Sequence, residues 1–146
     1  MLTPDVNVLV YAHREDAPDH LAYRSWLEQL LAGPAPFGLA ELVLAGFLRV
    51  VTHPRIFSPP TPLEQAFKFA NQLQSHRLAV VLRPGTRHWG LFVDLARAVQ
   101  ARGNLLQDAY LAALAIESGS EWVTADRDFS RFPGLAWRHP LAPVDD

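Results

Sequence analysis

The 146-residue sequence contains no cysteine and only one lysine. Without cysteine the chain forms no disulfide bonds and offers no thiolate to a metal ion, a composition that suits a reducing compartment. The N-terminus shows no basic region followed by an apolar one, so we expect no signal peptide. The longest apolar stretch, Leu42 to Val51, contains Arg49 and is too short to cross a bilayer. We therefore expect a cytoplasmic protein that does not enter the membrane.

Positive and negative residues are nearly balanced in the sequence. The net charge is −2, so the chain lacks the global basic character of many nucleic-acid-binding proteins. Lys68 is the only lysine, whereas the sequence has twelve arginines. Arginine can bind phosphate through two parallel hydrogen bonds. A GC-rich coding bias would produce the same excess of arginine. The sequence also has no glycine-rich phosphate loop and no Gly-x-Ser-x-Gly motif, and its six histidines lack a metal-binding spacing.

Size and apolar content predict one folded unit. A chain of this length with 49% apolar residues can bury enough surface for a single core. Its densest run of breaker residues, at 52–61, is a proline-rich loop too short to separate two domains. We expect a single domain at 1–140, followed by a short tail at 141–146.

Five segments have the spacing or the end signals of helices. They run over 18–32, 39–52, 61–76, 87–102 and 105–118. The third begins with a capping box made by Thr61 and Glu64, and the fifth begins with another made by Asn104 and Gln107. Asp108 then falls in a first helical turn, where the helix dipole stabilises a carboxylate.

Short apolar runs predict strands at 78–82, 122–124 and 135–138. Segment 6–12 is ambiguous, because its β-branched residues favour a strand, Pro4 is awkward inside a central strand, and Asn7 could equally cap a short helix. Strands that alternate with helices imply an α/β fold with a parallel sheet. In such sheets ligands gather outside the carboxyl ends of the strands.

Four acidic residues lie at boundaries beside apolar stretches, where a carboxylate adds nothing to a core. They are Asp5, Glu41, Asp108 and Asp126. Burying an unpaired carboxylate is costly, and a hard divalent cation such as Mg²⁺ would be the natural partner if the four converge. Each acid alone also has a structural explanation, namely a cap, an exposed helix position, a dipole-stabilised first turn, and a turn with a local ion pair.

The order and surroundings of these acids resemble the PIN-domain nucleases, and among them the VapC toxins of bacterial toxin–antitoxin modules. The matching motifs are Asp-Val-Asn at 5–7, Glu-Leu-Val-Leu-Ala at 41–45 with the segment 48–57, Gln-Asp-Ala-Tyr-Leu at 107–111, and Val-Thr-Ala-Asp-Arg-Asp at 123–128. Each motif alone is weak, but four in order over nearly the whole chain are specific. The resemblance implies a PIN-like fold, a central parallel sheet flanked by helices, with a first strand at 1–4 and a helix from Asn7 onward.

The resemblance also implies a metal site. Mg²⁺ or Mn²⁺ would be held mainly by Asp5 and Asp108, with Glu41 and Asp126 completing the catalytic acidic cluster. Supporting residues would orient these ligands or the phosphate from further out, or add another acid: Asn7, Thr124 and Asp128. Arginines near the cluster would hold flanking phosphates, the candidates being Arg49, Arg55, Arg127 and Arg131.

The function implied is that of a metal-dependent endoribonuclease, the toxin of a toxin–antitoxin pair. Its expected partners are an RNA substrate, with structured transfer or ribosomal RNA favoured, a small antitoxin protein that covers the active site, and a second copy of the chain in a homodimer. Two alternatives stay open: a housekeeping PIN-domain nuclease in RNA processing, and a non-catalytic PIN-fold binding module.

Overall fold

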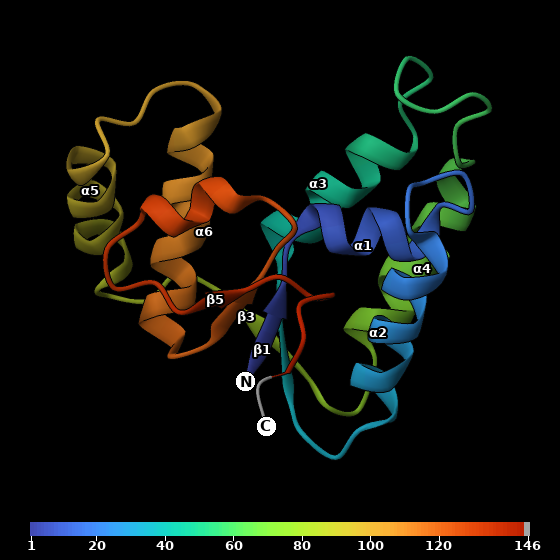
Figure 1. Cartoon of the computed structure of the whole chain (residues 1–146), viewed down its shortest axis with the longest axis horizontal. Helices are drawn as coiled ribbons and strands as arrows, with labels where there is room; N and C mark the ends of the chain where they lie inside the picture. Colours follow the sequence, from blue (N-terminus) through green and yellow to red (C-terminus); the bar gives the residue numbers. More distant parts are fainter. Residues whose placement is uncertain (145–146) are drawn as a thin grey trace.

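Five short parallel strands form one sheet in the computed structural model, which describes residues 1–144 (Figure 1). Their spatial order is β3-β2-β1-β4-β5. The strands are β1 (Leu2–Pro4), β2 (Phe37–Ala40), β3 (Ala79–Leu82), β4 (Glu121–Val123) and β5 (Trp137–Arg138). The expected α/β fold is therefore confirmed. Residues 145 and 146, the end of the expected tail, lie outside the described residues.

Helices cover both faces of the sheet. They are α1 (Val6–His13), α2 (His20–Ala32), α3 (Glu41–Val51), α4 (Leu63–Gln74), α5 (His88–Ala98) and α6 (Asn104–Ser118), with a 3₁₀-helix η1 (Arg127–Arg131). Figure 1 shows α5 and α6 on one side of the sheet and α1 to α4 on the other. Among residues 1–144, no helix combines the length and the apolar character that a bilayer crossing requires.

The ambiguous start of the chain is a strand followed at once by a helix, as the family resemblance implied. Pro4 is the last residue of β1, so its missing N–H does not interrupt the sheet, and the next N–H, of Asp5, donates to the carbonyl of Val123 over 2.8 Å. The cap of α1 is Asp5, whose carboxylate accepts from the N–H of Val6. The suggestion that Asn7 caps this helix was wrong.

The prediction of one helix over 39–52 was wrong at its beginning. Leu39 and Ala40 belong to β2, all four residues of which are buried, and α3 begins only at Glu41. A fully buried strand that runs into an apolar helix shows no change of polarity at the junction, so periodicity cannot separate them. This junction matters, because it places Glu41 at the carboxyl end of β2.

Several predicted ends and burials also need correction. The strand expected to be buried at 78–82 is β3, an edge strand in which Val80 is 41% exposed. The helix expected to reach Arg102 ends at Ala98. Thr61 makes no helix cap, because its hydroxyl accepts instead from Arg14, over 3.2 Å, and contacts the ring of His13.

The start of α6 differs from the prediction in a way that affects the site. Gly103 is the N-cap, with φ of 59°, and Asn104 is already the first helical residue. Asp108 therefore lies beyond the first turn, where the dipole of the helix has little effect. The expectation of a dipole-stabilised Asp108 was wrong.

Candidate active site

A cavity of about 360 Å³ opens at the carboxyl edge of the sheet, between α1 and α3 on one side and α6 on the other. Asp5 and Asp126, which follow β1 and β4, both line it, and so does Asp108 of α6. β1 pairs with β2 on one side and with β4 on the other, so the order of the strands reverses beside β1. Ligands of open α/β sheets bind at such a switch point. The fold thus brings three of the four expected acids to one cavity.

Asp5 is held rigidly and is only 6% exposed. One carboxylate oxygen accepts from the N–H of Val6 over 2.6 Å. The other accepts from the hydroxyl of Thr124 over 2.7 Å and from the amide of Asn7 over 3.3 Å. Burial raises the pKa of Asp5 to about 6, against the lowering effect of its hydrogen bonds to Thr124 and Val6, and the charge of Asp126 raises it further.

Asn7 and Thr124 tie the ends of β1 and β4 together. The amide of Asn7 donates to the hydroxyl of Thr124 over 3.1 Å, and its carbonyl oxygen accepts from the N–H of Ala125 over 3.1 Å. The same Thr124 hydroxyl accepts from the N–H of Asp126 over 3.0 Å. These bonds fix the relative positions of Asp5 and Asp126, the two acids that follow these strands.

Asp108 faces the same cavity from α6. Burial raises its pKa to about 6, and the negative charges of Asp5, Asp126 and Asp128 add to the shift. Within residues 1–144, no hydrogen bond and no ion pair reaches its carboxylate. Asp108 is thus a partly buried acid whose charge is destabilised by burial and by its acidic neighbours.

Asp126 and Asp128 are less constrained. Asp126 caps η1, because its carboxylate accepts from the N–H of Asp128 over 2.9 Å. Asp128 is exposed and does not line the cavity, but its negative charge contributes to the raised pKa of Asp108.

The structure does not bring Glu41 into the cavity. Its side chain is 52% exposed and pairs with Arg83, with 2.6 Å between Oε1 and Nε. The parallel register of β2 with β3 aligns Ala40 with Leu82, so Glu41 and Arg83, the residues that follow, emerge side by side. Glu41 therefore differs from the other three acids in having a cation partner.

The donor set at the cavity suits a hard divalent cation. Asp5 and Asp108 present carboxylate oxygens, the ligands that Mg²⁺ and Mn²⁺ prefer, and burial is the main cause of the raised pKa of each. In the described part of the chain, no three histidine or acidic side chains are grouped closely enough to enclose a metal ion. Mg²⁺ is commonly bound through one or two carboxylates and keeps several waters, so Asp5 and Asp108 would be enough protein ligands for it.

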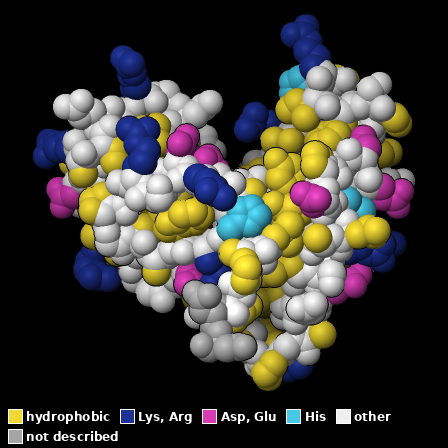
Figure 2. All heavy atoms as spheres, viewed as in Figure 1, with side chains coloured by type: hydrophobic (Ala, Val, Ile, Leu, Met, Phe, Trp, Pro, Cys, Tyr) yellow, Lys and Arg dark blue, Asp and Glu magenta, His cyan; other side chains and the backbone are white. Residues whose placement is uncertain are grey.

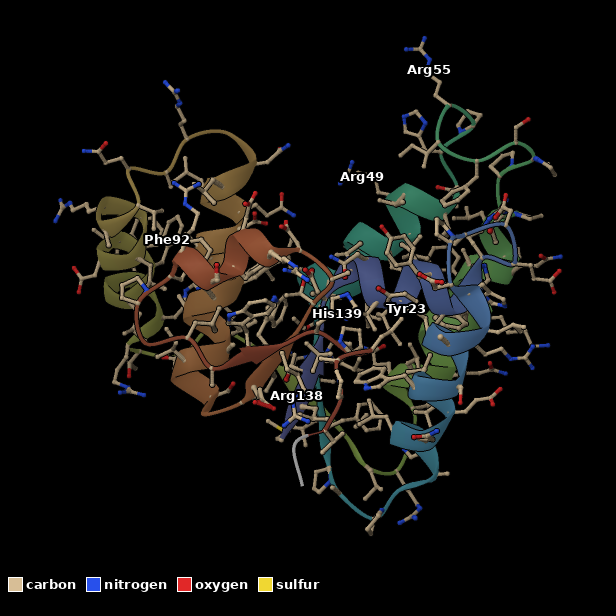
Figure 3. All side chains as sticks on the ribbon, in the orientation of Figure 1. Tyr23, Arg49, Arg55, Phe92, Arg138 and His139 are labelled. Atoms are coloured by element: carbon tan, nitrogen blue, oxygen red, sulfur yellow. The ribbon has the colours of Figure 1, made fainter. Side chains whose placement is uncertain are left out.

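Sequence reasoning gave Asn104 and Gln107 no role in the site, although both line the cavity. With Asp108 and Leu111, which line it too, they are spaced by three and four residues and so share one face of α6. That spacing was the available signal. On the opposite wall Gly46, Arg49 and Val50 share one face of α3, and Arg49 extends beside the gap that faces α6, whereas Arg55 points away from the body of the molecule (Figure 3).

Comparison with known sequences identifies close relatives. The family model of the PIN domain matches residues 2–135. Ribonuclease VapC43 from Mycobacterium tuberculosis is 51% identical over 141 residues, which cover 97% of this chain and 96% of the relative. Ribonuclease VapC25 from the same organism is 41% identical over 144 residues, with coverage of 99% and 100%.

Solved structures share the fold at lower identity. The complex VapBC2 from Rickettsia felis, bound to a DNA fragment from its promoter, matches with a TM-score of 0.70 and 22% identity, covering 94% of this chain and 97% of the solved one. VapC20 from Mycobacterium tuberculosis matches with a TM-score of 0.67 and 14% identity, covering 93% and 97%. These likenesses establish the architecture independently of the sequence motifs.

Proposed function

The chain belongs to the PIN-domain family, together with the VapC ribonucleases, and from that premise we propose that it is an endoribonuclease that cuts RNA at the cavity lined by Asp5, Asp108 and Asp126. The observation that carries the proposal is the pair Asp5 and Asp108, two acids with pKa raised to about 6 that line one cavity at the switch point of the sheet. Perturbed acids in a cleft are a mark of functional sites.

In this proposal Asp5 and Asp108 hold Mg²⁺ or Mn²⁺, and Asp126 adds negative charge beside them. When bound, the ion neutralises charge on the phosphate and lowers the pKa of a coordinated water. Glu41 joins the set only when its carboxylate leaves Arg83. Glu41 is therefore proposed as an additional ligand, less important than the three acids that line the cavity.

The remaining residues position these acids. Thr124 and Asn7 both donate to the buried carboxylate of Asp5, which fixes the direction of its oxygens. Outer partners of this kind orient metal ligands, and their loss typically costs about 10–100-fold in affinity or activity. Arg49, on the opposite wall of the cavity, supplies a guanidinium that can hold a phosphate oxygen of the strand.

Metal dependence is the direct test of this function. Purified protein should cut total RNA when Mg²⁺ or Mn²⁺ is supplied, because a bound cation would offset the repulsion between the carboxylates and the phosphodiester and activate a water. Cleavage is read on a denaturing gel, with EDTA and then an excess of Mn²⁺ added to the same sample. Cleavage that persists in EDTA would remove the metal from the proposal, and the absence of cleavage under every metal condition would favour a non-catalytic binding module.

We further propose that the enzyme is the toxin of a toxin–antitoxin pair, active on structured RNA such as transfer or ribosomal RNA and assembled as a homodimer. Its partner would be a small antitoxin that places an arginine or lysine among the acids of the cavity, where negative charge is concentrated. Analogy with the family supports these assignments.

Growth on induction separates a toxin from a housekeeping nuclease. Expression of the chain alone should arrest growth, and co-expression of the antitoxin should relieve the arrest because the inserted cation occupies the acidic cavity. The measurement is colony formation after induction, with protein levels followed by immunoblot. Normal growth despite full expression of folded protein would support the housekeeping nuclease instead.

A further inference from the structure

A second cavity, of about 580 Å³, lies beside the candidate active site and has a basic lining. Arg102 and Arg131 line it together with Val99, Gln100 and Leu105, and no carboxylate is among these lining residues. The active-site cavity, in contrast, is lined by three aspartates. Two neighbouring hollows of opposite charge thus occur on one molecule.

The two cavities share α6 and the segment that contains η1. Helix α6 contributes Asn104 and Asp108 to the acidic cavity and Leu105 to the basic one. The 3₁₀-helix η1 is capped by Asp126, which lines the acidic cavity, and ends at Arg131, which lines the basic one. With a rise of about 2 Å per residue in a 3₁₀-helix, Arg131 lies roughly 10 Å along the chain from Asp126. A polynucleotide is long enough to occupy both hollows at once.

The positive charges of Arg102 and Arg131 are exposed and are not paired with a carboxylate within residues 1–144. Each is exposed, and the salt bridges found within residues 1–144 involve other arginines, namely Arg14, Arg24, Arg83 and Arg138. A guanidinium presents its donors in a planar fork that matches two phosphate oxygens. The N-terminal end of α6, a helix of 15 residues, adds positive potential to this place.

A cationic site near the acidic cavity would help RNA to bind. The three aspartates repel a polyanion, so the strand needs cationic contacts on either side of the cut. Figure 2 shows Lys and Arg side chains on both sides of the notch that separates the two halves of the molecule. Arg49 lines the acidic cavity from α3, and Arg102 and Arg131 line the basic cavity at the start of α6.

We propose that Arg102 and Arg131 bind a backbone phosphate of the RNA strand, next to the linkage that lies at Asp5 and Asp108. Val99 and Leu105 offer an apolar wall for the adjoining nucleotide. This inference rests on the proposed ribonuclease function, because it assigns a place to the strand that the acidic cavity cuts. The contact is to the backbone, so it holds the strand without reading its sequence.

Arg102→Gln, Arg131→Gln and the double variant test the proposal, with Arg77→Gln as the matched control. Arg77 is exposed and precedes β3, so it lies at the opposite edge of the sheet and undergoes the same change of charge. Binding is measured by fluorescence anisotropy with a labelled single-stranded RNA of mixed sequence. All variants carry Asp108→Asn, which blocks cleavage during the measurement. Cleavage rates are measured in parallel without that substitution.

The double variant should bind RNA roughly tenfold more weakly than the control, because it can no longer donate charged hydrogen bonds to phosphate. The dependence of log K on log[salt] should become shallower by about 0.7 for each phosphate that the protein no longer neutralises. Cleavage should show a raised KM with little change in kcat, and Arg102→Lys with Arg131→Lys should restore the salt dependence. Melting curves confirm that each variant is folded.

The outcomes separate this inference from the proposed function. If the wild type cuts RNA and the double variant binds and cuts like Arg77→Gln, the phosphate site is overturned and the ribonuclease function stands. If the lysine variants fail to recover the salt dependence although they are folded, the arginines act on the structure and not on phosphate. If the wild type neither cuts nor binds RNA with any metal, both proposals fall.

Discussion

Asp108→Asn is expected to lower the rate of RNA cleavage by more than about 100-fold. Loss of a residue that merely orients a metal ligand typically costs about 10–100-fold, and Asp108 is proposed as a ligand itself. The substitution keeps the shape of the side chain and removes its charge, so the cavity retains its geometry but loses half of the carboxylate pair formed with Asp5. The measurement is the single-turnover rate in saturating Mg²⁺ on the same RNA.

Asp94→Asn provides the control for this loss. Asp94 is an exposed residue of α5 and does not line the cavity, so the same change of charge should leave the rate unaltered. The circular dichroism of both variants should match that of the wild type. A folded Asp108→Asn protein with full activity would exclude Asp108 as a metal ligand, and equal losses in both variants would indicate a general effect of net charge.

The parts of the site that follow strands could be predicted from the sequence. Asp126 follows a short apolar run, the strand before Asp5 was implied by the family resemblance, and the carboxyl ends of parallel strands share one edge of a sheet. Asn7 and Thr124 were predicted to support them, and the structure places both within hydrogen-bond distance of Asp5. The assignment of catalytic roles to these residues stays a prediction.

The partner of Glu41 could not be predicted, because it depends on the pairing of distant strands. Arg83 is 42 residues away in the sequence and reaches Glu41 only through the register of β2 with β3. Nothing local marks Arg83 as the residue that would take this carboxylate. The expectation of four equivalent acids therefore does not hold for Glu41. Its ion pair with Arg83 is a long-range contact that cannot be predicted from the sequence alone.

Local signals were misleading where packing decided the outcome. The Asn104 and Gln107 pair has the spacing of a capping box, but the helix begins one residue earlier than that pattern requires, after Gly103. The shift moves Asp108 out of the region where the dipole acts, and burial beside other acids then raises its pKa. The sequence alone suggested a stabilised carboxylate, whereas the structure contains a destabilised one.

That destabilised carboxylate leads to a second prediction: Asp108→Asn should melt at a higher temperature than the wild type in EDTA at pH 7. The pKa of Asp108 rises from 3.8 to about 6, which at 1.36 kcal/mol per unit would correspond to about 3 kcal/mol. Partial exposure and coupling to Asp5 reduce this to about 1–2 kcal/mol. For a chain of this size that gain raises the melting temperature by roughly 3–6 °C. Removal of the charge breaks no hydrogen bond found within residues 1–144.

The difference between the two proteins should depend on pH. An acid whose pKa is higher in the folded than in the unfolded state destabilises the fold once it ionises, so wild-type stability falls as pH rises from about 4 to about 6 and stays lower above that. The asparagine side chain of the variant does not titrate. The melting temperatures should therefore converge near pH 4 and separate above pH 6, apart from the contribution of Asp5, which both proteins retain.

Mg²⁺ should reverse the order, because only the intact pair Asp5 and Asp108 binds it well. At a concentration about 100-fold above the dissociation constant, binding adds about 2.7 kcal/mol to the wild type, more than the variant gains from removal of the charge. Thermal melts of both proteins in EDTA and in Mg²⁺ therefore give opposite rankings. A variant that melts lower than the wild type in EDTA would show that Asp108 stabilises the fold. The raised pKa would then lose its connection to metal binding, because a carboxylate that supports the structure needs no cation to compensate it.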